Sequence, residues 1–479
     1  MLPEGFKIVL DRRARWAEGG TVLVGGAPIR LLRFTPAGRA LVDRLAAGQP
    51  VPRSTGAQSL ARRLLDAGLA HPRPPVTAST PEVAVIIPVR NDAAGLEATL
   101  MALPDGAAVV VVDDASTDAA GLSAGVKHPG TTVLRRADQG GPAAARNDGW
   151  RATGTPLVAF VDANCEPEPG WLDIVLPHFA DPQVAAVAPR IVPPAGPGDG
   201  GALAAYEAVA SPLDLGIREA NVRPGSPVPY VPTAALVVRR SALEELDGFD
   251  ERLTVGEDVD LVWRFVAAGW TVRYEPRAIV RHPIRRSWAA RLQQRFRYGT
   301  SAAPLAHRHG WAVAPAAVSS WTAGAWALAV AGHPLLGLAT AASSMAALRR
   351  QVPGAEAVRL AGLGHLRGGL ALARALRRAW APAAVVLAMT GRRRRSARSA
   401  LAVAIAVPGL VDWFQRRPRL DPARFAALRL ADDLAYAGGV WAGCARERSA
   451  RALLPDLRTT SRRRVRQTYD PVSTIGGDS

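Results

Sequence analysis

The chain has 479 residues and a formal net charge of +18, with hydrophobic residues at 48% and charged residues at 21%. This length predicts more than one structural unit, and the composition excludes a globally disordered chain. Nearly every cation is an arginine, because Lys7 and Lys127 are the only lysines. The basic residues are concentrated in the second half, which favours contact with an anionic membrane surface or with phosphate groups. No nucleic-acid recognition motif accompanies them, so we expect no nucleic-acid partner.

Residues 1–80 predict a small unit that ends in a proline-rich linker at 71–75. Glycines separate its two short strands, and Thr35-Pro36 has the pattern of a helix start. The expected strands and second helix are Thr21–Val24, Ile29–Arg33 and Gln58–Ala67. Short strands followed by helices predict a winged-helix-like module. A plain scaffold and a peptide-recognition module are both consistent with it.

Residues 83–305 alternate strands and helices, the pattern of a parallel sheet. Apolar runs at 83–87, 108–112 and 156–161 are typical of strands that are covered on both faces. Two of these runs end in acidic residues, Asp113-Asp114 and Asp162. Open α/β folds bind ligands at the carboxyl ends of their strands, so we predict an α/β domain with its site there.

Two polar motifs follow these strands. Asp113 and Asp114 can accept hydrogen bonds from a ribose hydroxyl or a base N–H, although the same residue types also build local turns. Asp162 and Asn164 lie two positions apart and offer oxygen ligands that suit Mg²⁺ or Mn²⁺. Such a cation would stabilise charge on a leaving diphosphate.

Two further motifs lie on expected helices. Glu257 and Asp258 open an amphipathic helix, where acids also favour the helix dipole, and either could take a proton from an attacking hydroxyl. Near residue 295, Arg297 could pair with diphosphate oxygens and Tyr298 could stack on a sugar or base. A basic helix face beside a membrane is the alternative for this second motif.

Residues 306–479 predict a helical region that is associated with a membrane. The stretch Trp311–Leu348 contains no Asp, Glu, Lys or Arg, and Gly332-His333-Pro334 interrupts it. Each half approaches the roughly 20 residues that span a bilayer, and the arginines on both sides place both ends in the cytoplasm. We therefore predict that the protein is located at the cytoplasmic face of the cell membrane. If the helices are a buried alanine-rich pair instead, the protein is cytoplasmic.

Taken in order, these motifs resemble the family 2 glycosyltransferases, which have the GT-A (nucleotide-diphospho-sugar transferase) fold. The resemblance covers Val83 to about Tyr298, under half of the chain. It implies catalytic residues Asp258 and Glu257, metal ligands Asp162 and Asn164, and donor-binding residues Pro88, Asp113, Asp114, Arg146, Asn147, Gln294, Arg297 and Tyr298. Asn164 replaces a family aspartate, so the metal site carries less negative charge. Tyr298 replaces a family tryptophan.

The resemblance implies an inverting transfer of a sugar from a UDP-sugar donor to a hydroxyl acceptor. The length, the run Arg295–Ser301 and the leading module resemble family members that add β-linked glucose to a peptide-derived redox cofactor of the mycofactocin type. The charge-free stretch favours an alternative, a membrane transferase with a lipid-linked or polysaccharide acceptor. Asn164 favours another, a non-catalytic membrane-tethered binding or assembly protein.

Overall fold

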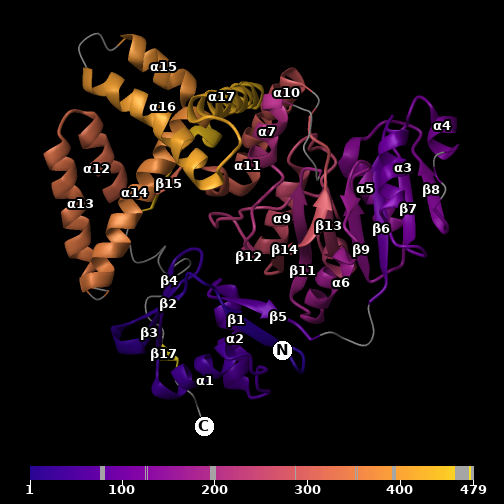
Figure 1. Ribbon diagram of the computed structural model, residues 1–479, viewed down its shortest axis with the longest axis horizontal. Coiled ribbons are helices and arrows are strands. Elements are labelled where there is room, and N and C mark those ends of the chain that lie inside the picture. Colours follow the sequence, from indigo (N-terminus) through magenta and orange to yellow (C-terminus); the bar gives the residue numbers. More distant parts are fainter. Residues whose placement is uncertain are drawn as a thin grey trace. The chain divides into compact units, whose positions relative to one another are not determined.

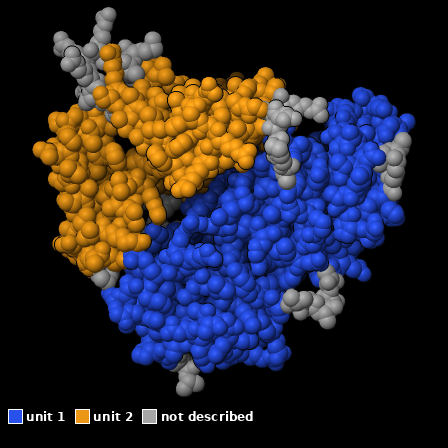
Figure 2. Space-filling model, viewed as in Figure 1, with its two compact units in different colours: residues 1–196, 210–284, 470–479 blue, residues 197–209, 285–469 orange. Residues whose placement is uncertain are grey.

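A computed structural model describes residues 1–75, 81–124, 126, 128–194, 201–285, 287–350, 352, 354–390, 395–458 and 474–475 (Figure 1). The chain forms two compact units (Figure 2). Unit 1 contains residues 1–196, 210–284 and 470–479, and unit 2 contains residues 197–209 and 285–469. The first two regions expected from the sequence therefore share one unit, and most of the helical region forms the other.

The amino-terminal module of unit 1 is built from short strands and two helices. They are β1 (Lys7–Leu10), β2 (Arg15–Ala17), the 3₁₀ turn Glu18–Gly20, β3 (Val22–Gly25), β4 (Arg30–Phe34), α1 (Pro36–Ala46), α2 (Thr55–Asp66) and β5 (Ala70–Arg73). Strand β1 pairs with β5, β2–β3–β4 form an antiparallel meander, and β17 (Thr474–Ile475) pairs with β4. The Thr35 hydroxyl caps α1 by accepting from Gly38 N at 3.2 Å. The predicted strands and helices are confirmed, and the winged-helix comparison stays a prediction.

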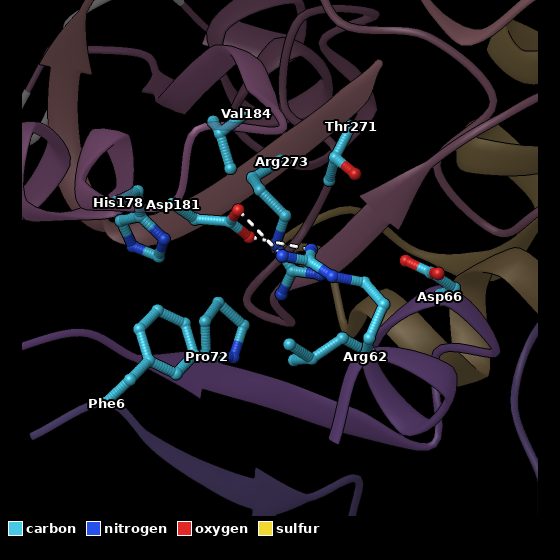
Figure 3. Close-up of a pocket in the computed structure, with 10 residues that line it drawn as sticks. Phe6, Arg62, Asp66, Pro72, His178, Asp181, Val184, Thr271 and Arg273 are labelled. Carbon is cyan, nitrogen blue, oxygen red and sulfur yellow. Dashed lines mark hydrogen bonds and ion pairs between the residues drawn. The ribbon is translucent and has the colours of Figure 1, made fainter. Parts of the chain in front are cut away.

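The module is joined to the rest of unit 1 by partly buried ion pairs. Arg62 donates to both carboxylate oxygens of Asp181 at 2.8 Å, and Arg73 does the same to Glu219 at 2.7 and 2.6 Å. The Arg62–Asp181 pair lines a pocket with Arg273 (Figure 3). Burial lowers the pKa of Arg273 to about 10, and the nearby Glu219 opposes this shift. Bidentate pairs have a fixed geometry, so the module is held in a defined orientation within the unit.

A nine-stranded sheet forms the centre of unit 1. Its strands are β6 (Val83–Val89), β7 (Ala108–Asp113), β8 (Thr131–Arg135), β9 (Leu157–Val161), β10 (Glu166–Pro167), β11 (Val184–Val192), β12 (Ala220–Val222), β13 (Ala235–Arg239) and β14 (Thr271–Arg281). The order is β10-β14-β11-β13-β9-β6-β7-β8, and β12 also pairs with β14. The three strands expected from apolar runs are β6, β7 and β9, which lie side by side and parallel.

The prediction of a parallel sheet is wrong, because the sheet is mixed. Strand β13 runs antiparallel to both of its neighbours, β9 and β11, and β10 and β12 run antiparallel to β14. A parallel strand needs a crossover connection, usually a helix. The apolar run of a buried strand does not reveal the direction of the strand, so the antiparallel entry of β13 could not be predicted from it.

Helices of unit 1 accompany this sheet. They are α3 (Ala93–Met101), α4 (Ala119–Ala124), α5 (Gly141–Arg151), α6 (Trp171–Val175) with the 3₁₀ turn Leu176–Ala180, α8 (Arg240–Glu245) and α9 (Glu257–Ala267). Helix α5 approaches the sheet closely, because a Cβ atom on Gly149 would overlap the side chain of Ile86 in β6. This contact fixes the position of the polar residues that α5 carries.

Unit 2 is mainly helical, as predicted. Its elements are α7 (Gly201–Ala210), α10 (Trp288–Thr300), α11 (Ala302–His309), the 3₁₀ turn Gly310–Val313, β15 (Ala317–Ser319), α12 (Ser320–Val330), α13 (Pro334–Leu348), α14 (Gly354–Arg378), α15 (Ala381–Thr390), α16 (Arg395–Arg416), α17 (Pro422–Arg446), the 3₁₀ turn Arg451–Leu453 and β16 (Asp456–Arg458). The interruption predicted at Gly332-His333-Pro334 separates α12 from α13.

The predicted membrane-spanning hairpin is not confirmed. Helix α12 has 11 residues and α13 has 15. Over the described parts of the chain, no helix combines the length and the apolar character that crossing a membrane requires.

Candidate active site

The end of β7 carries an aspartate that organises the following loop. Asp113 is 2% exposed; one carboxylate oxygen accepts from Ser116 N at 2.9 Å and the other accepts from Arg135 Nη1 at 2.6 Å. Sequence reasoning missed Arg135. The register of the parallel pair β7–β8 sets it opposite Asp113, so a basic residue at the end of the neighbouring strand was the available signal.

Asp114 joins β7 to the start of α5. Its two carboxylate oxygens accept from Gly140 N and Gly141 N, both at 2.8 Å, and Arg136 forms an ion pair with it at 3.1 Å. Sequence reasoning also missed Arg136. A carboxylate has about four lone-pair sites, so Asp114 can still accept from a further donor.

The turn after β6 is tied to the same loop. Pro88 lies near the end of β6, opposite Val112 of β7. Beyond it, Asn91 has a φ of 54° and its side-chain oxygen accepts from Thr117 N at 2.8 Å. The ends of β6 and β7 therefore form one rigid polar surface at the carboxyl edge of the sheet.

Arg146 of α5 brings the predicted metal site and the predicted base together. Its Nη2 donates to Asp162 Oδ1 at 2.7 Å and its Nη1 donates to Glu257 Oε1 at 3.0 Å. Asp162 follows β9 and Glu257 begins α9, so one guanidinium connects three elements. The arginine is 3% exposed, and such charge-assisted bonds are strong when they are buried.

Asp258 is the neighbouring carboxylate, and its environment suits a base. Burial and the charge of Glu257 raise the pKa of Asp258 to about 7, while Arg146 acts in the opposite direction. A base is most effective when its pKa lies near the working pH. Asp260 differs, because it accepts from Arg264 Nε at 2.7 Å and stabilises its own helix.

Asn147 has a different position from that of its neighbour Arg146. Its amide nitrogen donates to Phe249 O at 2.9 Å and to Glu251 Oε1 at 2.8 Å, and its oxygen accepts from Phe249 N at 2.9 Å. These bonds hold the turn at 247–251, where Gly248 has a φ of 64°. Asn147 therefore fixes the turn that precedes α9.

The predicted metal ligands offer a partial coordination sphere. Asp162 is 33% exposed at its side chain and Asn164 is half-buried beside it. Within the described ranges, no group of three or more His, Cys, Asp or Glu side chains could hold a metal ion. The pair fits a hard cation that takes its remaining oxygen ligands from a diphosphate.

The last predicted donor-binding residues lie on α10 in unit 2. Gln294 Nε2 donates to the Tyr298 hydroxyl at 2.8 Å, and Gln294 Oε1 accepts from Arg285 Nε at 3.2 Å. Arg297 is exposed on the same helix. Residues three and four positions apart share a helix face, so these three side chains form one polar face of α10.

Helix α10 packs on α17 without room for side chains at their closest approach. A Cβ atom on Gly439 would overlap the carbonyl oxygen of Phe296, and one on Gly299 would overlap that of Tyr436. Beside these glycines, Arg291 donates to Asp432 Oδ1 at 2.9 Å with both side chains 1% exposed. The polar face of α10 is therefore positioned by α17.

Replacing Gly439 by alanine should destabilise the fold by about 1–3 kcal/mol, because the added methyl group overpacks this contact. Gly438→Ala is a matched control. Its Cβ atom would lie 3.5 Å from the Phe296 ring, an ordinary contact, and alanine favours a helix by about 1 kcal/mol. In urea unfolding, Gly439→Ala should lower the free energy of unfolding and Gly438→Ala should raise it. Equal effects of the two variants would contradict the close packing.

Known proteins resemble this chain. Residues 81–301 match the family described as "Glycosyltransferase like family 2". One relative is 43% identical over 482 residues, which cover 96% of this chain and 99% of the relative. The chain belongs to the family 2 glycosyltransferases and is an enzyme of that family. The relative is the "Pre-mycofactocin glycosyltransferase" of Mycobacterium tuberculosis (strain ATCC 25618 / H37Rv).

More distant proteins match smaller parts of the chain. "Glycosyltransferase AglE" of Haloferax volcanii is 28% identical over 234 residues, 47% of this chain and 74% of its own. Among solved structures, a mannosyltransferase of Pyrobaculum calidifontis in complex with GDP-Man and Mn²⁺ aligns with a TM-score of 0.37 and 20% identity, over 70% of this chain and 89% of its own. The family prediction is confirmed, and the fold is α/β and GT-A-like with a helical carboxyl-terminal region.

Proposed function

We propose that this glycosyltransferase moves glucose from UDP-glucose to a hydroxyl of pre-mycofactocin, with inversion to a β-linked product. The relative with that acceptor in its name aligns with almost the whole chain, including the amino-terminal module. The observation that carries the chemistry is the contact of Arg146 with both Asp162 and Glu257, next to Asp258 with its raised pKa.

In this proposal the carboxyl edge of the sheet binds the donor. Asp114 accepts from the base N–H, while Pro88 and Asp113 shape the surface beneath the nucleoside. Arg146 orients the donor side of the site, and Asn147 acts through the turn that it holds. The family resemblance also assigns donor binding to Gln294, Arg297 and Tyr298 of α10, where Arg297 would offset the diphosphate charge.

The transfer is a single displacement. The acceptor oxygen forms a bond to the anomeric carbon as the bond from that carbon to the diphosphate breaks. The acceptor proton passes to Asp258, and UDP leaves with the electron pair. Glu257 keeps Asp258 basic through its negative charge, and Arg146 holds Glu257 in place. Positioning both reactants in line lowers the barrier further.

Asp162 and Asn164 would hold Mg²⁺ or Mn²⁺ in this enzyme. A bound divalent cation supplies charge neutralisation for the leaving diphosphate. Asn164→Asp should lower the Mn²⁺ concentration that gives half-maximal activity by on the order of tenfold, because a second carboxylate adds charge to the ligand set. Metal titration after chelation measures this, with Asn91→Asp as a control outside the pair. An unchanged requirement would remove Asn164 from the metal site.

The pH profile tests the roles of the acidic pair. The value of kcat/KM should rise as the pH increases to about 7, since Asp258 must lose its proton to act. Glu257→Gln should move this rise to lower pH, because the neighbouring negative charge that raises the pKa is gone. An unshifted profile in the variant would show that another group controls it.

The acceptor is tested with purified full-length protein and radiolabelled UDP-glucose. Pre-mycofactocin should be labelled and a polyprenyl-phosphate or polysaccharide acceptor should not. The reverse result would favour the membrane transferase that the charge-free α12 and α13 suggest. If no acceptor is labelled and UDP-glucose is not hydrolysed, the proposed donor and acceptor are wrong. Deleting residues 1–75 should weaken pre-mycofactocin binding if the module recognises a peptide-derived acceptor.

A further inference from the structure

Exposed large hydrophobic side chains are concentrated in unit 2. In the charge-free segment 311–348 they include two tryptophans on α12 and three leucines at the start of α13, which are exposed as follows: Trp321 37%, Trp326 39%, Leu335 79%, Leu336 56% and Leu338 67%. The turn between the helices, residues 331–334, is also exposed. Leu335, Leu336 and Leu338 adjoin this turn, and water contact with neighbouring apolar groups is unfavourable, so this surface indicates a binding partner.

The two helices differ from ordinary surface helices. A surface helix normally has one polar face, but the outward hydroxyl groups of α13 bond to its own backbone. Thr340 Oγ1 donates to Leu336 O and Ser343 Oγ donates to Ala339 O, both at 2.9 Å. Helices α12 and α13 lie side by side (Figure 1), and a Cβ atom on Gly337 would lie 2.6 Å from Ala325 O. The pair is thus a close-packed hairpin with few free polar groups on α13.

The charge of this part of the chain, and the two arginines that follow α13, indicate the kind of partner. Residues 285–469 contain 31 arginines but only seven acidic residues, and Arg349 and Arg350 directly follow α13 and are exposed. Residues 1–284 contain more acidic than basic residues. An apolar surface bordered by arginines complements a bilayer that contains anionic phospholipids.

We propose that the α12–α13 hairpin attaches the enzyme to the surface of an anionic membrane, with residues 330–338 inserted at the boundary between headgroups and acyl chains. Helix α13, the longer of the two, extends about 22 Å, which is less than the hydrocarbon thickness of about 30 Å. The hairpin therefore binds at the interface. This proposal stands apart from the proposed donor and acceptor, because it rests on other residues.

Sedimentation of the full chain with vesicles tests the proposal. Vesicles of equal parts phosphatidylglycerol and phosphatidylcholine should bind the protein, phosphatidylcholine alone should bind it weakly, and salt should reduce binding. Leu335→Asp should lower the partition coefficient by about tenfold or more, since it removes one inserted side chain. Asp in the first turn of α13 suits the helix dipole, so the fold should be retained.

Ile217→Asp is the matched control. Ile217 is 75% exposed in unit 1, so the substitution makes the same chemical change at a similarly exposed position. It should leave vesicle binding unchanged. Absence of binding by the wild-type protein, or equal loss in the two variants, would overturn the proposal. So would a lipid-free dimer that Leu335→Asp dissociates in sedimentation velocity, because a second copy would then cover the surface.

Discussion

Asp258→Asn should lower kcat by about a hundred- to ten-thousand-fold, the contribution expected of a positioned general base. The amide cannot take the acceptor proton, but it has nearly the same size. Affinity for UDP should therefore change little, because the donor contacts assigned to Asp114 and Arg297 are retained. Product formation under saturating donor measures kcat, and calorimetric titration with UDP measures the affinity for UDP.

The same variant should be more stable than the wild-type protein. The pKa of Asp258 rises from its ordinary value of 3.8 to about 7 on folding. A carboxyl group with a raised pKa in the folded state weakens folding as the pH increases through that window. Asparagine removes this effect, so the melting temperature at pH 8 should rise by about 2 °C or more.

Asp260→Asn is the contrasting substitution on the same helix. It removes the negative charge from the bond with Arg264, so it should lower stability while most turnover is kept. If Asp258→Asn kept near-normal turnover, or if Asp260→Asn removed it, the proton acceptor would have to be reassigned.

Arg146→Met should lower the free energy of unfolding by about 3–5 kcal/mol at pH 8, because it leaves the buried Glu257 and the half-buried Asp162 without their counter-charge. Asp162 and Glu257 each lose a charge-assisted bond. The loss should be smaller at pH 5, because Asp258, with its pKa of about 7, is then protonated and adds no negative charge beside Glu257. Guanidinium unfolding at both pH values measures the difference.

Arg146→Lys separates charge from geometry. Lysine keeps the positive charge but cannot donate in two fixed directions as a guanidinium does. We expect intermediate stability and activity reduced by more than tenfold, since a shift of about 1 Å at a site can cost a hundredfold. If Arg146→Met lost the same free energy of unfolding at both pH values, the role of Arg146 would instead be packing against the Phe249 ring. The Arg146 Cζ atom lies 5.6 Å from the centroid of that ring.

Local patterns predicted much of this fold. Continuous apolar runs identified β6, β7 and β9 because strands buried on both faces lack polar alternation. Thr35-Pro36 identified the start of α1 because its capping bonds lie within four residues. The parallel assignment failed at β13, whose direction depends on a connection rather than on its own residues.

The sequence predicted part of the candidate site as well. The acidic residues were identified from their places at strand and helix ends, whereas their partners required three-dimensional information. Asp162 and Glu257 are 95 positions apart in the sequence, yet both contact Arg146. Arg135 and Arg136 looked like ordinary surface cations until the register of β8 brought them to the acidic loop. The packing of α17 on α10 has no short-range signal at all.

The antiparallel strand has a consequence for synthesis on the ribosome. Strand β9 has β6 on one side, but its other neighbour, β13, is made more than 70 residues later, and the sheet is complete only after β14 ends at Arg281. The nascent chain therefore carries an open strand edge for several seconds at translation rates of about 5–20 residues per second. Chaperone dependence and aggregation of truncated products should be greatest for chains that stop between residues 161 and 235.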